Sequence, residues 1–157
     1  MPTIQLKTRI KASVQVCFDL SRNIDVHIES TRQTGETAIA GKTSGLIGLN
    51  ETVTWRAKHF GVWQTLTSKV TEMQSPDFFA DEMVKGAFKS FRHEHYFEDS
   101  NGYTLMTDIF VFESPLGILG LIANVLFLKQ YMCNILMKRN AVIKEFAERD
   151  INANKAV

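Results

Sequence analysis

The sequence has few cysteines and lacks the charge imbalance that marks a nucleic-acid-binding protein. Only two cysteines occur in 157 residues, Cys17 and Cys133, and both stand in apolar surroundings. We therefore expect buried, reduced thiols rather than a disulfide or a thiol-based zinc site. The formal net charge is +1, and lysine and arginine are scattered along the chain. Because a surface that binds a phosphate backbone needs clustered positive charge, we expect no nucleic-acid partner.

Long apolar runs are also missing, with one exception. Residues 116–128 (LGILGLIANVLFL) are almost wholly apolar, but this stretch is shorter than the run of about 20 apolar residues that crosses a bilayer. We expect it to form a buried or interfacial helix, without stable membrane insertion. The first residues (MPTIQ) contain no apolar signal core, which favours a cytoplasmic location. No nucleotide-binding loop or nucleophile elbow occurs, and no cofactor is expected.

The order of the expected elements indicates an α+β fold. Apolar and polar residues alternate over residues 4–10, which predicts a strand. Two short helices follow, the first capped by Ser13 and the second at about residues 23–31. From Glu36 onward, valine, threonine and aromatic residues between turn signals predict about six strands. After Pro115 the apolar spacing becomes helical and predicts a long helix that ends near Arg149.

Strands followed by one long helix with an apolar stripe favour an antiparallel sheet that the helix covers. The expected fold is therefore the helix-grip fold: a curved antiparallel sheet of about seven strands wrapped on a long C-terminal helix. The length of 157 residues suits one domain, which we place at residues 1–150, with a frayed tail at residues 151–157.

The best-defined strand pairing lies around Asn101 and Gly102. A two-residue Asn-Gly turn has positive φ at both positions and fixes the register of the strands on either side. Counting back from this turn places His95 opposite Asp108. We expect this face of the strands to be concave, because the other face carries charged side chains. The side chains on the concave face are Phe91, His93, His95, Phe97, Met106, Asp108, Phe110 and Phe112.

Two further hairpins extend this face. A count across the Lys85-Gly86-Ala87 loop places Asp81 opposite Phe91, although a three-residue loop can contain a bulge that shifts the register. A count across the turn at residues 60–61 places Trp55 opposite Leu66, with the indole pointing inward. At this position Trp55 could either pack in the core or contact a ligand.

The two histidines and Asp108 allow three interpretations. His95 and Asp108 form a satisfied buried pair, with His93 bound to backbone or water. Alternatively, these groups orient the polar end of a ligand in an apolar pocket. In the third interpretation they carry chemistry, either with His95 as a general base polarised by Asp108 or as a metal site. The pattern lacks a clear third ligand, so we assign no metal, and His95 and Asp108 remain candidates for catalysis.

Other polar and sulfur-containing residues have simpler explanations. Arg139 could reach the carboxylates of the sheet from the helix, but a surface ion pair is the default expectation. Met132 is expected to pack in the core. His27 falls in the second short helix and is expected to be solvated. His59 and Trp63 lie near a hairpin end, where a surface position and a pocket rim are equally good interpretations.

Several local strings resemble one known superfamily. They are Gly61, PDFFAD at residues 76–81, GAF at 86–88, HEHYF at 93–97, MTDIF at 106–110, SPLG at 114–117 and KRN at 138–140. Together with the element order, they resemble the START-like superfamily, also called SRPBCC, and within it a bacterial cyclase/dehydrase-like subfamily. The superfamily includes pollen-allergen-like proteins, lipid-transfer domains and polyketide cyclases. The resemblance implies the helix-grip fold and ligand binding, and it carries over no catalytic residue.

We therefore expect the protein to bind an apolar or amphipathic small molecule, such as a lipid, an aromatic or a polyketide-like compound, between the sheet and the C-terminal helix. A cyclase- or dehydratase-like enzyme using His95 and Asp108 is an alternative, as is a membrane-surface or protein-interaction module built on residues 116–128. The protein is expected to be a monomer or a homodimer. The residues expected to contact the ligand are Trp55, Leu66, Phe79, Asp81, Phe91, His93, His95, Phe97, Met106, Asp108, Phe110, Ile122, Leu126 and Met137.

Overall fold

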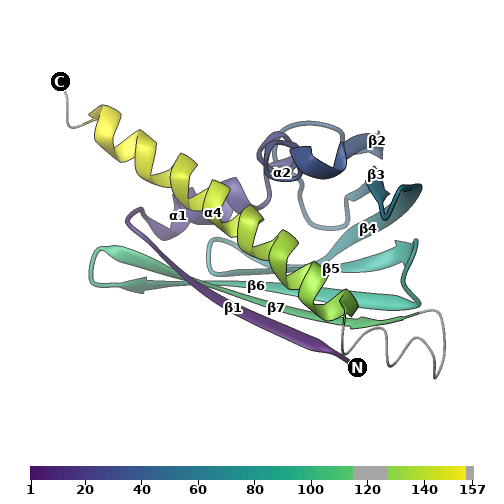
Figure 1. Ribbon diagram of the computed structural model, residues 1–157. Helices are drawn as coiled ribbons and strands as arrows, with labels where there is room; N and C mark the ends of the chain where they lie inside the picture. Colours follow the sequence, from purple (N-terminus) through teal and green to yellow (C-terminus); the bar gives the residue numbers. More distant parts are fainter. Residues whose placement is uncertain (115–126, 155–157) are drawn as a thin grey trace.

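The computed structural model describes residues 1–114 and 127–154, in which one antiparallel sheet is crossed by a long helix (Figure 1). Neighbouring strands run in the order β1-β7-β6-β5-β4-β3-β2, so β2 to β7 form a meander and β1 pairs with β7. This architecture confirms the expected helix-grip fold. The strands are β1 (Thr3–Ile10), β2 (Thr37–Gly41), β3 (Thr52–His59), β4 (Val62–Gln74), β5 (Phe78–Lys85), β6 (Ser90–Ser100) and β7 (Tyr103–Glu113).

The helices begin where side chains can satisfy the free N–H groups of a first turn. The Ser13 hydroxyl accepts a hydrogen bond from the Val16 N–H, which confirms the expected cap of the first helix. The Asn23 side chain caps the second helix by accepting from two backbone N–H groups. None of the described helices is long and apolar enough to span a membrane. The helices are α1 (Val14–Ser21), α2 (Ile24–Ser30), the short 3₁₀ helix η1 (Arg32–Thr34) and α4 (Lys129–Asn154).

The hairpin between β6 and β7 has the expected register. Asn101 and Gly102 have φ values of 53° and 84°, as their two-residue turn requires. His95 consequently lies opposite Asp108. The β3–β4 hairpin also has a two-residue turn with positive φ, at residues 60–61, and the expected pairing of Trp55 with Leu66 is confirmed.

The expected register between β5 and β6 was wrong by two residues. Asp81 pairs with His93 rather than with Phe91, and the last pair of this ladder is Glu82 with Arg92. The connection from Lys85 to the start of β6 is longer than the three-residue loop that the count assumed. Because the error is an even number, Asp81 still points to the expected face of the sheet.

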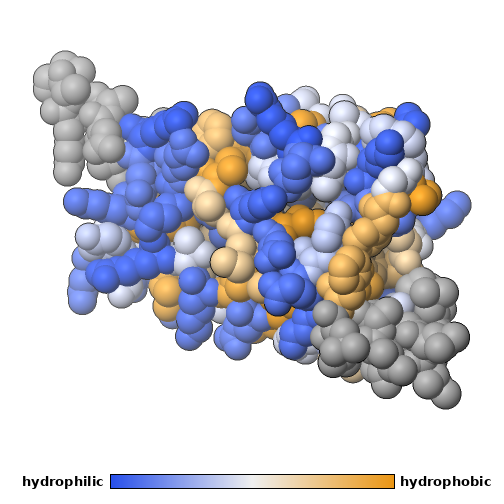
Figure 2. Space-filling view, in the orientation of Figure 1, coloured by the Kyte–Doolittle hydropathy of each residue, from blue (hydrophilic) through white to orange (hydrophobic). Residues whose placement is uncertain are grey.

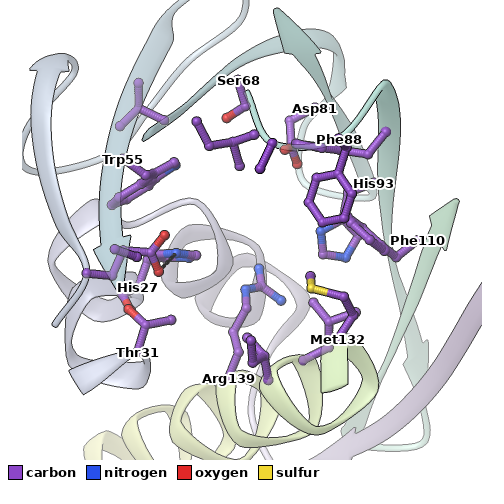
Figure 3. A pocket seen from close by; sticks show the side chains of 18 of the residues that line it. His27, Thr31, Trp55, Ser68, Asp81, Phe88, His93, Phe110, Met132 and Arg139 are labelled. Carbon is purple, nitrogen blue, oxygen red and sulfur yellow. Dashed lines mark hydrogen bonds and ion pairs between the residues drawn. The ribbon is translucent and has the colours of Figure 1, made fainter. Parts of the chain in front are cut away.

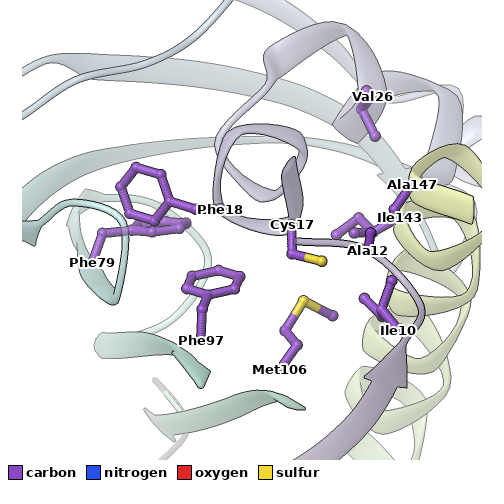
Figure 4. Close-up of a cluster of buried hydrophobic side chains, with 10 residues drawn as sticks. All are labelled: Ile10, Ala12, Cys17, Phe18, Val26, Phe79, Phe97, Met106, Ile143 and Ala147. Carbon is purple, nitrogen blue, oxygen red and sulfur yellow. The ribbon is translucent and has the colours of Figure 1, made fainter. Parts of the chain in front are cut away.

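A compact apolar core fills one end of the space between sheet and helices (Figure 4). Its largest side chains are aromatic: the rings of Phe18 and Phe97 meet edge to face with centroids 5.6 Å apart. Phe97 and Met106 are fully buried in this core. Besides these, it contains Ile10, Ala12, Cys17, Val26, Phe79, Ile143 and Ala147.

The buried stripe of α4 differs from the expected one. Met137, expected to face the sheet, is 55% exposed, while the neighbouring Leu136 is buried. Arg139 is also buried, which corrects the expectation of a surface ion pair. The face of α4 that points away from the sheet is mostly hydrophilic (Figure 2). Ile122 and Leu126, expected on the same stripe, lie outside the described residues.

Candidate functional site

A cavity of about 500 Å³ lies between the concave face of the sheet and the N-terminal half of α4 (Figure 3). Its volume is in the range of small-molecule sites. Trp55 and His27 face the cavity from one side, His93 and Phe110 from the other, and Arg139 reaches in from α4 (Figure 3). The predicted contacts that line it are Trp55, Leu66, Phe79, Asp81, Phe91, His93, His95 and Phe110.

The remaining predicted contacts lie elsewhere. Phe97 and Met106 pack in the core cluster of Figure 4 and do not line the cavity. Met137 is exposed on α4, and Met132, five residues earlier and expected in the core, lines the cavity instead. Asp108 lies behind the histidines, fully buried.

Asp108 is the centre of a buried polar network. Its Oδ1 accepts hydrogen bonds from His95 Nδ1 at 2.9 Å, His93 Nε2 at 3.1 Å and Arg139 Nη1 at 3.2 Å. Its Oδ2 accepts from Asn140 Nδ2 at 2.7 Å. Burial alone would raise the pKa of Asp108, but the hydrogen bonds from the two histidines and the charge of Arg139 hold this pKa well below its ordinary value. The carboxylate is therefore ionised. The hydrogen bond between His93 and Asp108 corrects the first interpretation, in which His93 bound backbone or water.

His95 bridges two carboxylates. Its Nδ1 faces Asp108, and its Nε2 lies 3.1 Å from Asp81 Oδ1. An ionised carboxylate only accepts hydrogen bonds, so both contacts form together when both ring nitrogens carry protons. Burial would raise the pKa of Asp81, but the hydrogen bond from His95 and nearby positive charge lower it. Asp108 also has the Arg139 guanidinium beside it, so the two carboxylates face one imidazole and one guanidinium.

His93 behaves differently from its neighbour. Burial is the largest cause that lowers its pKa, followed by repulsion from His95, and together they bring it to about 4 despite the opposing pull of Asp108. The ring is neutral above that pH. Because Nε2 donates its proton to Asp108, Nδ1 carries a lone pair.

A second polar group borders the cavity and was missed by the sequence analysis. His27 Nε2 lies 3.1 Å from Glu36 Oε2, and the His27 ring packs on Trp55 with centroids 4.3 Å apart. His59 Nδ1 lies 2.8 Å from the Tyr131 hydroxyl. His27 is therefore a cavity residue rather than a solvated one. Each pair joins residues from separate elements, so no local sequence pattern marks them.

The arrangement can recognise a polar group on an otherwise apolar molecule, because it combines aromatic walls with a few fixed donors and acceptors. It could also hold a cation. Asp81, His93 and His95 each offer one ligand atom, and these atoms all lie within 4.8 Å of one another.

No protein-family model and no curated protein matches the chain. Solved structures match its fold. A protein from Thermus thermophilus is 13% identical and has a TM-score of 0.77, with 95% of this chain and 99% of that chain covered. The major latex-like protein 151 from Panax ginseng is 16% identical, with 93% and 97% covered and a TM-score of 0.67.

A third structure, of Ara h 8.0201, is 10% identical over 90% of this chain and 97% of that chain, with a TM-score of 0.63. At such identities these structures show a shared fold and say nothing about which ligand is bound. Together with the strand order and the long C-terminal helix, they show that the chain has the helix-grip fold.

Proposed function

We propose that the protein binds an apolar or amphipathic small molecule in the cavity between the sheet and α4. The observation that carries this proposal is the cavity of about 500 Å³, whose wall is mainly apolar and aromatic but includes buried, hydrogen-bonded polar groups. Ligand sites of this kind gain affinity from apolar contact and orientation from a few polar groups. Lipids, aromatic compounds and polyketide-like compounds have this mixed character.

The cavity wall indicates how such a ligand would lie. Its apolar body would pack against Trp55, Leu66 and Phe91, which come from three different strands. Its polar group would meet His93, whose Nδ1 lone pair can accept a hydrogen bond, and Arg139, which reaches in from α4. A hydroxyl group suits this pair, because it can donate to the imidazole and accept from the guanidinium.

The hydrogen bonds of His95 favour this binding function over general-base catalysis. Both of its ring nitrogens already face carboxylates, at 2.9 and 3.1 Å. A general base needs an unprotonated nitrogen within reach of the substrate. His95 would therefore have to lose one of these contacts before it could accept a proton.

Fluorescence of an apolar dye such as anilinonaphthalene sulfonate, displaced by fatty acids and by aromatic compounds, tests the proposal. We expect the dye to bind at one site per chain and Leu66→Trp, which fills the cavity, to lower its affinity at least tenfold. Val84→Trp adds the same side chain at an exposed position outside the cavity and should bind the dye as the wild type does. Equal binding by the folded Leu66→Trp variant, or no binding by the wild type, would overturn the proposal.

A further inference from the structure

The geometry points to a second kind of site in the same cavity: a site for a divalent transition-metal ion, formed by Asp81, His93 and His95. Their ligand atoms all lie within 4.8 Å of one another. Two imidazoles and one carboxylate suit zinc and ferrous iron. This inference goes beyond the binding of an organic molecule and does not depend on it.

The sheet itself brings the three side chains together. Asp81 on β5 lies directly opposite His93 on β6. His95 lies two residues further along β6, so its side chain points to the same face of the sheet. The observed register places Asp81 beside the two histidines and so supplies the third ligand that the sequence pattern alone did not identify. Since all three ligands belong to paired strands, the site is preorganised.

A second shell of hydrogen bonds holds the two rings from behind. Asp108 accepts from His95 Nδ1 at 2.9 Å and from His93 Nε2 at 3.1 Å. In metal sites, a carboxylate that accepts the other ring N–H fixes the orientation of a ligating histidine. With these contacts in place, His95 Nε2 and His93 Nδ1 are the ring nitrogens that would face an ion. Arg139 and Asn140 in turn hold Asp108 in place.

The distance between His95 and Asp81 suits two ligands of the same metal ion. His95 Nε2 lies 3.1 Å from Asp81 Oδ1. Metal–ligand bonds of about 2.1 Å place neighbouring ligand atoms roughly 3 to 3.5 Å apart. In the metal-free protein a proton on Nε2 occupies this contact. An ion bound to both atoms would take the place of this hydrogen bond.

The ion would be open to the cavity on one side. Asp81, His93 and His95 all line the cavity wall, whereas Asp108 is buried behind them. Three protein ligands leave at least one coordination position free, as in catalytic rather than structural metal sites. An oxygen atom of a molecule in the cavity could fill that position.

Metal titration of chelator-treated protein tests the inference directly. We expect equilibrium dialysis to show one Zn²⁺ bound per chain, and Co²⁺ to produce visible absorption bands that saturate at the same ratio. Asp81→Asn and His95→Gln should each lower the affinity at least tenfold, because each removes a ligand. Asp81 is partly exposed, so the Asp81→Asn variant keeps the test valid if His95→Gln does not fold.

Two matched variants serve as controls. Glu94→Gln changes a carboxylate that lies between the two histidines in the sequence but on the other face of β6, where it binds Arg92. His27→Gln alters the other histidine–carboxylate pair at the cavity. Both should bind Zn²⁺ as the wild type does. Absence of stoichiometric binding, or affinity that survives Asp81→Asn and His95→Gln, overturns the metal site. Dye binding by metal-free protein reports separately on the proposed ligand cavity.

Discussion

Asp108 accounts for much of the electrostatic character of the cavity wall, although it does not touch the cavity. Transfer of a carboxylate from water to a protein interior is costly unless its oxygens are hydrogen-bonded and its charge is paired. Asp108 meets both conditions through two histidines, Arg139 and Asn140. Its lowered pKa follows from these partners and not from burial, which acts in the opposite direction.

The low pKa of His93 makes the stability of the fold depend on pH. The pKa is about 4 in the folded protein against an ordinary 6.5, so the unfolded chain binds a proton more readily. The stabilisation is therefore complete above about pH 6.5 and is lost as the pH falls towards 4. A difference of this size in one buried group corresponds to roughly 3 kcal/mol of unfolding free energy. Urea unfolding at several pH values between 4 and 7 measures this loss.

A His93→Gln variant should show a flatter pH dependence in this range, because glutamine does not titrate. His59→Gln is the matched comparison, since burial lowers the pKa of His59 as well. We expect His59→Gln to retain most of the slope, because the pKa of His93 is the more strongly lowered one. Identical slopes in the wild type and in His93→Gln would contradict the assignment. Below about pH 4, protonation of Asp81 and Asp108 adds a further loss.

At the scale of elements, the two hairpins that meet at β6 show what a sequence can predict. The β6–β7 register was correct because the Asn-Gly turn leaves only one count of residues between the strands. The β5–β6 register was wrong because the connection has no such constraint, and its length had to be assumed. A two-residue error preserves the face, so Asp81 was placed on the correct face with the wrong partner.

The hairpin turn also yields a stability prediction. Gly102 has a φ of +84°, where a side chain is strained, and a Cβ there would have no atom within 4 Å. Gly102→Ala should therefore lower the unfolding free energy by about 1 kcal/mol through backbone strain alone. Gly48→Ala is the control, because its φ is negative or extended and its Cβ would make an ordinary contact. Equal urea midpoints for the two variants would contradict this explanation.

The helix α4 shows where apolar patterning fails. Its buried positions recur with helical spacing, but two of them, Arg139 and Asn140, are polar. A stripe drawn through apolar residues alone therefore includes the exposed Met137 and misses the cavity residue Met132. The contact of Arg139 with a sheet carboxylate was only the second interpretation of this residue, because its partner Asp108 lies on another element and an isolated arginine is typical of a surface position.

On the scale of the whole molecule, element order and periodicity were sufficient to predict the helix-grip fold, since few arrangements bury both a long apolar helix face and one face of an antiparallel sheet. The polar residues that reach the cavity from other elements could be identified only from the structure. Glu36, Tyr131 and Arg139 reach it from separate elements, and only the packing of α2 and α4 against the sheet brings them near the strands. Such long-range convergence leaves no local pattern.

The two cysteines provide a probe of global unfolding. Cys17 is fully buried in the core cluster, and burial raises the pKa of its thiol, whereas Cys133 is partly exposed. A thiol-specific reagent should modify Cys133 in native buffer and Cys17 only when the core opens. Mass spectrometry should then show one adduct in native buffer and two in urea, with Cys133→Ser as the control. Comparable labelling rates for both thiols in native buffer would contradict the burial of Cys17.

The pairing of β1 with β7 has a consequence for how the chain reaches its native state. Strands β2 to β7 pair with their neighbours in sequence, so each hairpin closes a short loop. The β1–β7 ladder instead joins the first strand of the chain to the last one, and Ile10 enters the core beside Met106 only after that closure. Closing so long a loop costs entropy before any contact repays it. The meander can therefore form early. We expect the pairing of β1 with β7, the first and last strands of the chain, to limit the folding rate.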